Sequence, residues 1–452
     1  MVFPVRYQAP PSRSHTVGSH YCNWMTQEIV TAGRDRSVTQ QPDLDEFGRE
    51  YARLSFAIER HVPGFIDAYL GPDDVRATLD PDDPVGAPPG HTIVAAARDL
   101  LAKIPSLDAT EGRKGYLTKQ VEAMRATARR VAGEVLPYRE EVRLLFDIEP
   151  LATPEAVYDA VIADLDSLLP GDGPITERMV AWRQSYAISP ETARRVVDVI
   201  LPELRARTEE FVDLPEGEAI EIRMVQDQPW SGYNWYLGNG RSRVDLNTDL
   251  PIYAYLLTDL LTHEGYPGHH TEHALKERLY TEHGLGEHAL QLINTPECVI
   301  SEGIATVAEK ILFAPDELVR FRRERVYPAA GITGDPEREV AIGAAQRILR
   351  SVPSNAALLL HEEGRDPEDV VAYLQRYALS SEAEARQRLR FIADPLWRAY
   401  IFTYHVGYEL ICGWLDEVPA QRRERFRTLL TDQVYPSQIA AWTTSGAGPL
   451  PA

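Results

Sequence analysis

The feature that most constrains the fold is a series of short stretches in which apolar residues recur every three or four positions. This spacing places apolar side chains on one face of an α-helix. The first stretch starts at Asp43 and reads DLDEFGREYARLSFAIERHVPGFIDAYL, with acidic residues in its first turn. Further helices are expected at residues 92–103, 112–132, 138–145, 154–169, 175–186 and 190–211. Pro, Gly or Asp bounds each of them, so the sequence predicts a mainly α protein.

One segment departs from this pattern and predicts β-structure. Within residues 218–249, AIEIRMV and RSRVDLN alternate in the manner of strands, and GYNWYLGNG between them is aromatic and rich in Gly. We expect a small sheet or hairpin here, before the helix that carries the motif described below. We predict a flexible tail at residues 1–42 and a single helical domain at 43–452. Its two halves are 43–215, which is helical, and 216–452, which carries the sheet and the motif described below.

Charge and cysteine content exclude several classes of protein. The formal net charge of −21 argues against binding to nucleic acid or to an anionic membrane surface. Cys22, Cys298 and Cys412 lack Cys-x-x-Cys spacing, so we expect free thiols and no disulfide framework. The first forty residues show no apolar core after a basic start, so we expect a cytoplasmic protein, with Met25 as an alternative start.

The stretch LLTHEGYPGHHTEH contains a His-Glu pair, His263 and Glu264. In the His-Glu-x-x-His motif, two histidines one helical turn apart bind Zn²⁺, and the glutamate activates the attacking water. Here the position one turn after His263 is Pro267. The next histidines, His269 and His270, follow His263 by six and seven residues. In an unbroken helix, a six-residue spacing separates side chains by about 9 Å along the axis, too far to share an ion.

The Pro-Gly pair could bring two histidines together despite this six-residue spacing. Pro267 interrupts the helical hydrogen bonds and Gly268 tolerates unusual backbone angles. We expect a local widening of the helix that brings His269 back over His263.

A third ligand is expected from the next long helix. SEGIATVAEK places Glu302 at the start of an apolar helical run, and Glu309 lies two turns further along the same face. Two histidines and one glutamate leave a coordination position open, as in catalytic zinc sites. We expect Glu309 to form a salt bridge or to support a ligand.

Together, HEGYPGHH and EGIATVAE resemble the bacterial family catalogued as domain of unknown function 885. Its usual pattern is His-Glu-x-x-Pro-Gly-His-His followed by Glu-Gly-Trp-Ala-x-x-x-Glu, and Ile304 stands where the family has Trp. That family is similar to helical zinc metallopeptidases of the thermostable carboxypeptidase and thimet oligopeptidase groups. The resemblance implies a zincin-like helical body with one Zn²⁺. It also implies that His263, His269 and Glu302 are the metal ligands and that Glu264 is the general base. The Gly-His pair of the related peptidases matches His269, and His270 is the second choice.

A second resemblance lies near the C-terminus. AYIFTYHVGYELICGW is similar to the Tyr-x-x-Gly segment of that family and to the Gly-Tyr-x-x-Gly-Tyr-Tyr segment of the oligopeptidases, although the usual Pro-Gly-Gln is missing. It implies that the hydroxyls of Tyr404 and Tyr408 donate to the oxyanion of the reaction intermediate. Taken alone, both tyrosines are equally compatible with a place in the core.

The remaining candidates concern substrate and structure. RSRVDLNTDL could be an edge strand that pairs with an extended peptide, which would place Asn247 beside the cleft. Tyr233, Trp235 and Tyr236 would lie near it. We expect His273, His283 and His288 at the surface or behind the ligands, and we expect His361 to be structural because no ligand partner follows it.

These features predict a zinc-dependent metallopeptidase that acts on peptide bonds. Two alternatives stay open: a metal-dependent hydrolase of a small non-peptide amide, and a non-catalytic helical binding protein.

Overall fold

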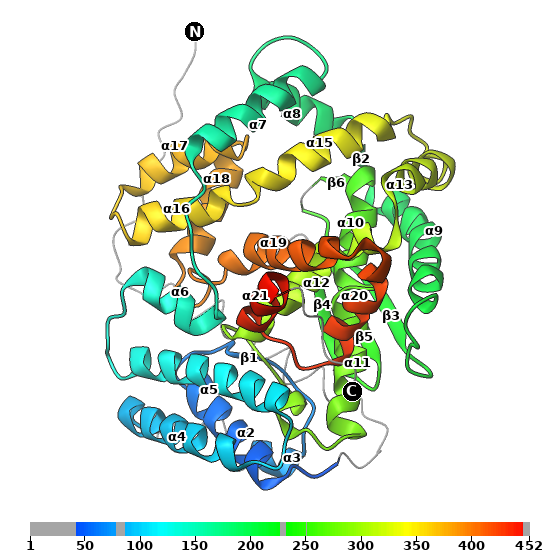
Figure 1. Cartoon of the computed structure of the whole chain (residues 1–452). Helices are drawn as coiled ribbons and strands as arrows, with labels where there is room; N and C mark the ends of the chain where they lie inside the picture. The colour runs from blue at the N-terminus through cyan, green and yellow to red at the C-terminus, as the bar shows by residue number, and fades with distance from the viewer. Residues whose placement is uncertain (1–41, 78–85, 227–231, 250, 446–452) are drawn as a thin grey trace. The chain divides into compact units, whose positions relative to one another are not determined.

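Helices dominate the residues that the computed structural model describes, which are 42–77, 86–226, 232–249 and 251–445 (Figure 1). The prediction of a mainly α protein is confirmed. All described residues belong to one unit, Gln40–Ala452. Of the predicted tail, only Pro42 lies within the described residues.

The helices are bounded as follows. The first half contains α2 (Glu46–Glu59), α3 (Asp73–Ala77), α4 (Gly90–Lys103), α5 (Glu111–Val131), α6 (Tyr138–Phe146), α7 (Glu155–Leu168), α8 (Ile175–Gln184) and α9 (Pro190–Glu209). The second half contains α10 (Leu257–Glu264), α11 (His269–Thr281), α12 (Pro296–Leu312), α13 (Pro315–Phe321), α14 (Tyr327–Ala330), α15 (Pro336–Leu349), α16 (Val352–His361), α17 (Pro367–Tyr377), α18 (Glu382–Ala393), α19 (Phe402–Glu417), α20 (Arg422–Thr431) and α21 (Pro436–Ser445).

Polar side chains cap several helix starts. Thr110 accepts a hydrogen bond from the backbone of Arg113, and Ser189 accepts one from Thr192. The first helix is shorter than its apolar spacing suggests, because α2 ends at Glu59 and its carboxylate accepts from the backbone of Gly64 and Ile66. The chain then forms strand β1 (Ile66–Tyr69), which the sequence analysis missed.

Short strands tie distant segments together. β1 pairs antiparallel with β7 (Leu290–Leu292), just before α12. β2 (Ala187–Ile188) pairs with β6 (Ile252–Tyr253), just before α10. Both pairings therefore attach the first half of the chain to segments that lead into the helices of the predicted site.

The predicted small sheet is present and has three strands, β3 (Ala219–Val225), β4 (Gly232–Gly238) and β5 (Arg241–Asn247), in the order β3-β5-β4. β5 is parallel to β3 and antiparallel to β4. The expectation that RSRVDLNTDL is an edge strand is wrong, because β5 is the central strand. β4 is the edge strand on the side of α10 and α11.

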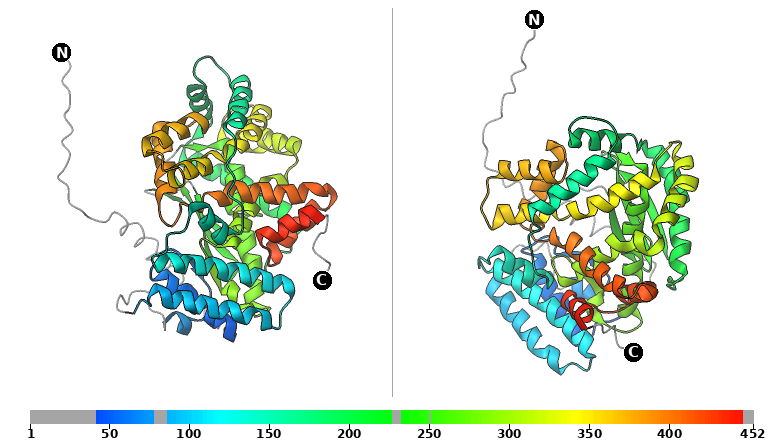
Figure 2. Two further views of the ribbon diagram at one scale, coloured as in Figure 1. Left: turned by 60° about the vertical axis from the view of Figure 1, so that its left-hand side comes forward. Right: turned by 45° about the horizontal axis from the view of Figure 1, so that its top comes forward.

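The buried centre of the second half is the crossing of α12 and α19 (Figures 1 and 2). Two glycines make this crossing close. A Cβ atom on Gly407 would lie 2.5 Å from the Val299 carbonyl oxygen, and one on Gly303 would lie 2.8 Å from the Gly407 carbonyl oxygen. The backbones can approach only because neither residue has a side chain, and this approach brings Glu302 of α12 close to Tyr404 of α19 and to Tyr400 just before α19.

Among the described residues, no helix has the length and apolar character that a bilayer crossing requires. Cys298 and Cys412 are free thiols, and Cys22 lies outside the described residues.

Candidate metal centre

The His-Glu motif lies at a break between two helices. His263 is in the last turn of α10, which ends at Glu264, and His269 is the first residue of α11. The expected widening of one continuous helix is therefore wrong. The turn between the helices contains a cis Tyr266–Pro267 peptide bond.

Gly268 explains how this turn stays tight. Its N–H donates to the Thr262 carbonyl at 3.0 Å, and a Cβ atom here would lie 2.0 Å from the His263 carbonyl oxygen. Only glycine allows the chain to fold back over the end of α10 at this distance. The imidazole rings of His263 and His269 consequently lie 4.8 Å apart, at right angles.

Glu302 completes a group of three possible ligands. Its Oε2 atom lies 3.5 Å from His263 Nε2 and 4.0 Å from His269 Nε2. One ligand atom from each residue lies within 4.8 Å of the others. Ligands bound about 2.0–2.1 Å from a tetrahedral zinc ion are separated by about 3.4 Å, so a small inward movement of these side chains would complete a zinc shell.

The hydrogen bonding of the Glu302 carboxylate leaves one oxygen available for a metal ion. Tyr400 donates its hydroxyl to Glu302 Oε1 at 2.9 Å. Glu302 Oε2 is buried and has no hydrogen-bond partner among the described residues. A buried carboxylate oxygen without a donor is costly, and a cation between this oxygen and the two imidazoles would remove that cost.

The charges around His269 also favour a cation. Burial alone would lower the pKa of His269, but the Glu272 carboxylate, 3.9 Å from Nδ1, and the charges of Glu302 and Glu264 raise it to about 9. Burial, together with the charge of His269, lowers the pKa of His263 well below its usual value. One imidazole is thus neutral and able to donate a lone pair, and the carboxylates around the other attract positive charge.

A second group of ligand-type side chains, His269, Glu272 and His273, overlaps the first. Glu272 already accepts hydrogen bonds at both oxygens, from Lys276 Nζ at 2.7 Å and from Ser301 Oγ at 2.6 Å. The Lys276 ammonium would also repel a metal ion. The group formed by His263, His269 and Glu302 is therefore the better metal site.

Glu264 lies beside this group and is buried. Its backbone carbonyl accepts a hydrogen bond from the Asn234 side-chain amide at 2.6 Å, which joins the end of α10 to β4. Burial, with a contribution from Glu302, raises the pKa of the Glu264 carboxyl to about 7. This value is near that of an effective general base at neutral pH.

The structure separates the two predicted tyrosines. Burial and the charges of Glu302 and Glu264 raise the pKa of Tyr404 well above its usual value, so its hydroxyl stays protonated beside the metal group. Tyr408 is engaged elsewhere, because its hydroxyl accepts from Arg347 at 2.8 Å. The carboxylates of Glu302 and Glu264 thus act on Tyr404, whereas Arg347, Cys412 and Lys310 act on Tyr408.

His270, the second choice for a ligand, faces away from the group. It is fully buried, with Nδ1 2.8 Å from Ser242 Oγ and Nε2 2.8 Å from Glu218 Oε2. Tyr266 also donates to this glutamate. His270 thus fixes the start of α11 against the sheet.

The other predicted residues are dispersed. Glu309 forms a buried ion pair with Arg322 at 2.9 Å, in keeping with the expected salt bridge. Asn247 is buried at the end of β5 and accepts from the backbone of Asp249, and the structure does not bring it to the metal group. Tyr233 donates to Asp67 at 2.5 Å, and its pKa is raised by burial and by the charge of Asp67, with a smaller contribution from Glu264.

Two predicted aromatics and four histidines lie in other settings. Trp235 donates to Asp245, and Tyr236 donates to Glu277. His273 packs on Tyr236, and His283 is exposed. His288 stacks on buried Tyr116, and His361 contacts the Ile392 carbonyl.

Four residues near the ligands were not predicted from the sequence. Tyr400 contacts Glu302, Ser301 contacts His269, and Glu272 and Lys276 lie behind Ser301. A signal for two of them was present. Glu272 follows His269 by three residues and Lys276 follows Glu272 by four, so all three share one face of α11.

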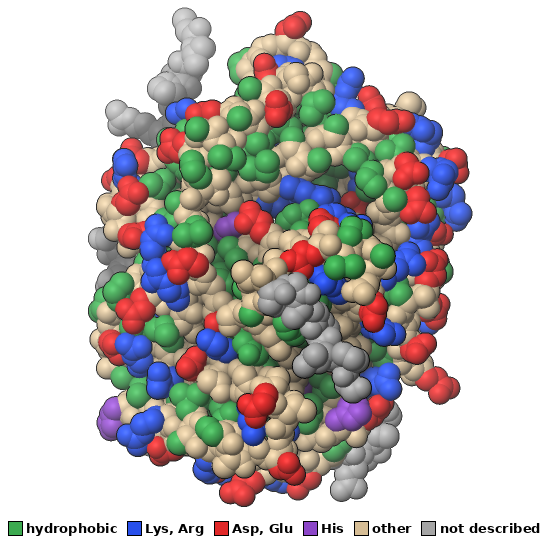
Figure 3. All heavy atoms as spheres, in the orientation of Figure 1, with side chains coloured by type: hydrophobic (Ala, Val, Ile, Leu, Met, Phe, Trp, Pro, Cys, Tyr) green, Lys and Arg blue, Asp and Glu red, His purple; other side chains and the backbone are tan. Residues whose placement is uncertain are grey.

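A hollow between α15 and α19 contains Lys and Arg side chains (Figure 3). Arg347 of α15 donates to Tyr408 of α19, and Arg350, just after α15, donates to Asp259 of α10. The charge of Arg350 contributes to the lowered pKa of His263, which places it near the metal group.

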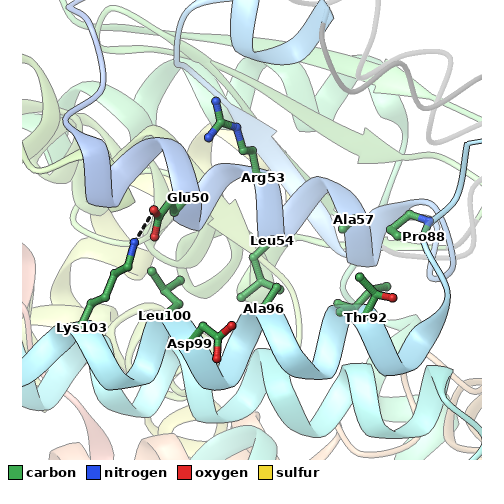
Figure 4. Close-up of a pocket in the computed structure, with 11 residues that line it drawn as sticks. Glu50, Arg53, Leu54, Ala57, Pro88, Thr92, Ala96, Asp99, Leu100 and Lys103 are labelled. Carbon is green, nitrogen blue, oxygen red and sulfur yellow. Dashed lines mark hydrogen bonds and ion pairs between the residues drawn. The ribbon is translucent and has the colours of Figure 1, made fainter.

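A separate groove of about 320 Å³ lies between α2 and α4 (Figure 4). Apolar residues such as Leu54 and Leu100 line it, with the Glu50–Lys103 ion pair at one end. No residue of the metal group lines this groove, so it has no part in the proposed chemistry.

Comparison with solved structures identifies the fold. The chain is similar to a Colwellia psychrerythraea protein described as a candidate lipoprotein, with 16% identity over 80% of this chain and 67% of that one, at a TM-score of 0.51. The two share a fold. A Shewanella oneidensis protein of unknown function, also described as a candidate lipoprotein, gives 14% identity over 78% of this chain and 72% of that one, at a TM-score of 0.46. No protein-family model and no curated protein matches the chain.

Proposed function

We propose that this chain is a zinc-dependent metallopeptidase related to the domain 885 family that its motifs resemble. One observation carries the proposal: His263 Nε2, His269 Nε2 and Glu302 Oε2 converge at a partly buried site beside Glu264, and no described residue donates a hydrogen bond to Glu302 Oε2. This donor set is the one that catalytic zinc sites use with a position left open.

The residues divide the chemistry among them. A Zn²⁺ ion held by His263, His269 and Glu302 would polarise the substrate carbonyl and lower the pKa of the attacking water. Glu264 accepts the proton of that water on its carboxylate and delivers it to the leaving amine. Its pKa of about 7 suits both transfers at neutral pH.

Tyr404 assists the attack of water on the substrate carbonyl. Its protonated hydroxyl on α19 donates to the carbonyl oxygen as negative charge develops there. We do not assign this role to Tyr408, because the charged groups that act on it are Arg347, Cys412 and Lys310 and not the carboxylates of Glu302 and Glu264.

Strand β4 is the best support for an extended substrate. It is an edge strand, and it is joined to the motif through Asn234 and the Glu264 carbonyl. A Cβ atom on Gly232 would lie 3.6 Å from Glu264 Oε1, so the start of β4 runs directly past the general base. A peptide that pairs with β4 would present its carbonyl groups to the site.

The test compares wild type with Glu264→Gln in metal content and in hydrolysis of a peptide mixture. We expect about one zinc per chain in both proteins and a loss of hydrolysis of at least about a hundredfold in the variant. Zinc-loaded wild type that cleaves a small amide but no peptide would favour the amide hydrolase. Wild type that takes up no zinc would reject the enzyme altogether.

A further inference from the structure

The side of His269 that faces away from Glu302 is held by a chain of polar contacts. Ser301 Oγ donates to Glu272 Oε2 at 2.6 Å and lies 3.1 Å from His269 Nδ1. The other oxygen of Glu272 accepts from Lys276 Nζ at 2.7 Å. Lys276 donates in turn to Glu297 at 3.1 Å. The motif does not contain these contacts, and the proposed chemistry does not use them.

The direction of the hydrogen bonds in this chain decides which nitrogen of His269 is free. A serine has one hydroxyl proton, and Ser301 donates it to Glu272. Ser301 can therefore only accept from His269, so Nδ1 carries the ring proton. In a neutral imidazole, Nε2 then keeps its lone pair. Nε2 is the atom that faces Glu302 Oε2.

Lys276 makes this arrangement possible in the interior. The side chain of Glu272 is 1% exposed and that of Lys276 is 9% exposed. A buried carboxylate needs a paired cation, and Lys276 is one helical turn away from Glu272 on α11. With one oxygen held by Lys276, the other stays aimed at Ser301.

The far end of the chain reaches the first half of the protein. Glu297 lies in the first turn of α12, and its second oxygen accepts from Tyr116 at 2.7 Å and from Gln120 at 3.3 Å, both on α5. Lys276 therefore lies between two carboxylates. Glu272 is on the side of the metal site, and Glu297 is hydrogen-bonded to α5. Its position depends on helices from both halves of the chain.

We propose that Lys276 is a positioning residue of the metal centre, which acts on His269 through Glu272 and Ser301 so that Nε2 faces the metal. This inference rests on the proposed function, because it concerns ligands assigned there. It adds that zinc affinity depends on a buried ion pair outside the ligand set.

The experiment measures the zinc dissociation constant by competition with a chromophoric chelator. Lys276→Met keeps the length of the side chain without its charge, and Ser301→Ala cuts the chain of contacts but leaves the ion pairs in place. We expect each to weaken zinc binding about tenfold or more. In the double variant, Lys276→Met should weaken it no further, because Lys276 acts through Ser301. Lys276→Arg should restore most of the affinity.

Lys119→Met is the matched control, since it removes a lysine from an ion pair of 2.8 Å with Asp147 at a distance from the site. It should leave zinc affinity unchanged. If Lys276→Met does not fold, Ser301→Ala carries the test alone. Folded Ser301→Ala with wild-type affinity, or additive losses in the double variant, would overturn the proposal. A wild type that binds no zinc would instead overturn the proposed function itself, and this inference with it.

Discussion

Tyr400 holds one oxygen of Glu302 and leaves the other open. Its hydroxyl donates to Oε1 at 2.9 Å, and Oε2 faces His263 Nε2 at 3.5 Å without a hydrogen-bond donor among the described residues. This asymmetry orients the carboxylate as a ligand that binds through one oxygen. It also makes Tyr400 part of the support of the metal site, although it contributes no ligand atom.

Tyr400→Phe should therefore weaken zinc binding by about tenfold while the fold is preserved, because Glu302 loses the contact that orients it. Chelator competition measures the effect. Tyr377→Phe is the control, since Tyr377 is likewise buried and donates to a glutamate, Glu155, at 2.8 Å on other helices. Equal zinc affinity in Tyr400→Phe and wild type would contradict this role.

The two adjacent histidines should respond differently to truncation. His269→Ala should lose stoichiometric zinc, since it removes a ligand. His270→Ala should keep zinc but unfold more easily, by about 1–3 kcal/mol, because Glu218 and Ser242 lose a buried partner. Metal analysis and urea unfolding of both variants test the assignment. If His270→Ala lost its zinc while His269→Ala kept one zinc per chain, the ligand would be His270 and not His269.

The close crossing of α12 and α19 predicts opposite effects for two glycines of α19. Gly407→Ala should destabilise the fold by about 1–3 kcal/mol or more and weaken zinc binding, since its Cβ would push the α12 backbone that carries Glu302. Gly413 is exposed and a Cβ there meets nothing within 4 Å, so Gly413→Ala should stabilise the protein by about 0.5–1 kcal/mol. Thermal unfolding measures the stability of both variants. Equal changes in Gly407→Ala and Gly413→Ala would show that Gly407 is not required for the close crossing.

His405 predicts a loss of stability in mild acid. Burial lowers its pKa to about 4, and its Nδ1 lies 3.0 Å from Ser354 Oγ. The unfolded chain, with a pKa of about 6.5, binds more protons than the folded chain between these values. The contribution is thus complete above about pH 6.5 and is lost as the pH falls toward 4, by about 3 kcal/mol in total.

Urea unfolding of wild type and His405→Gln at about pH 7, 6 and 5 tests this expectation. The variant should show a flatter dependence of its unfolding free energy on pH, since it lacks the titrating group. The same slope in both proteins would assign the acid sensitivity to other residues.

Much of the helical part of the fold could be read from local sequence. The helix expected at 112–132 is observed at Glu111–Val131, and the one expected at 138–145 at Tyr138–Phe146. Apolar spacing and capping residues act within one or two turns, so they are visible in a single sequence. Strand order is not, because alternation in β5 says that it is a strand but not which strands lie beside it.

The same division applies to the metal centre. His263, Glu264, His269 and Glu302 could be proposed from motif spacing, which is local. The role of Gly268 could not be read correctly, because the break between α10 and α11 depends on the packing of the turn over the carbonyls of α10.

The sequence by itself determined the mainly α character, the position of the small sheet and a short set of possible ligands, because these depend on residue types at fixed spacings. The tertiary structure alone decided that His269 faces Glu302 while His270 turns toward Glu218, since adjacent helical residues point about 100° apart and only packing selects which one faces the site. It also decided that Tyr404 lies by the carboxylates, that Tyr400 holds Glu302, and that Lys276 supports His269. Each of those contacts joins elements that are distant in the chain or depends on which face of a helix is buried.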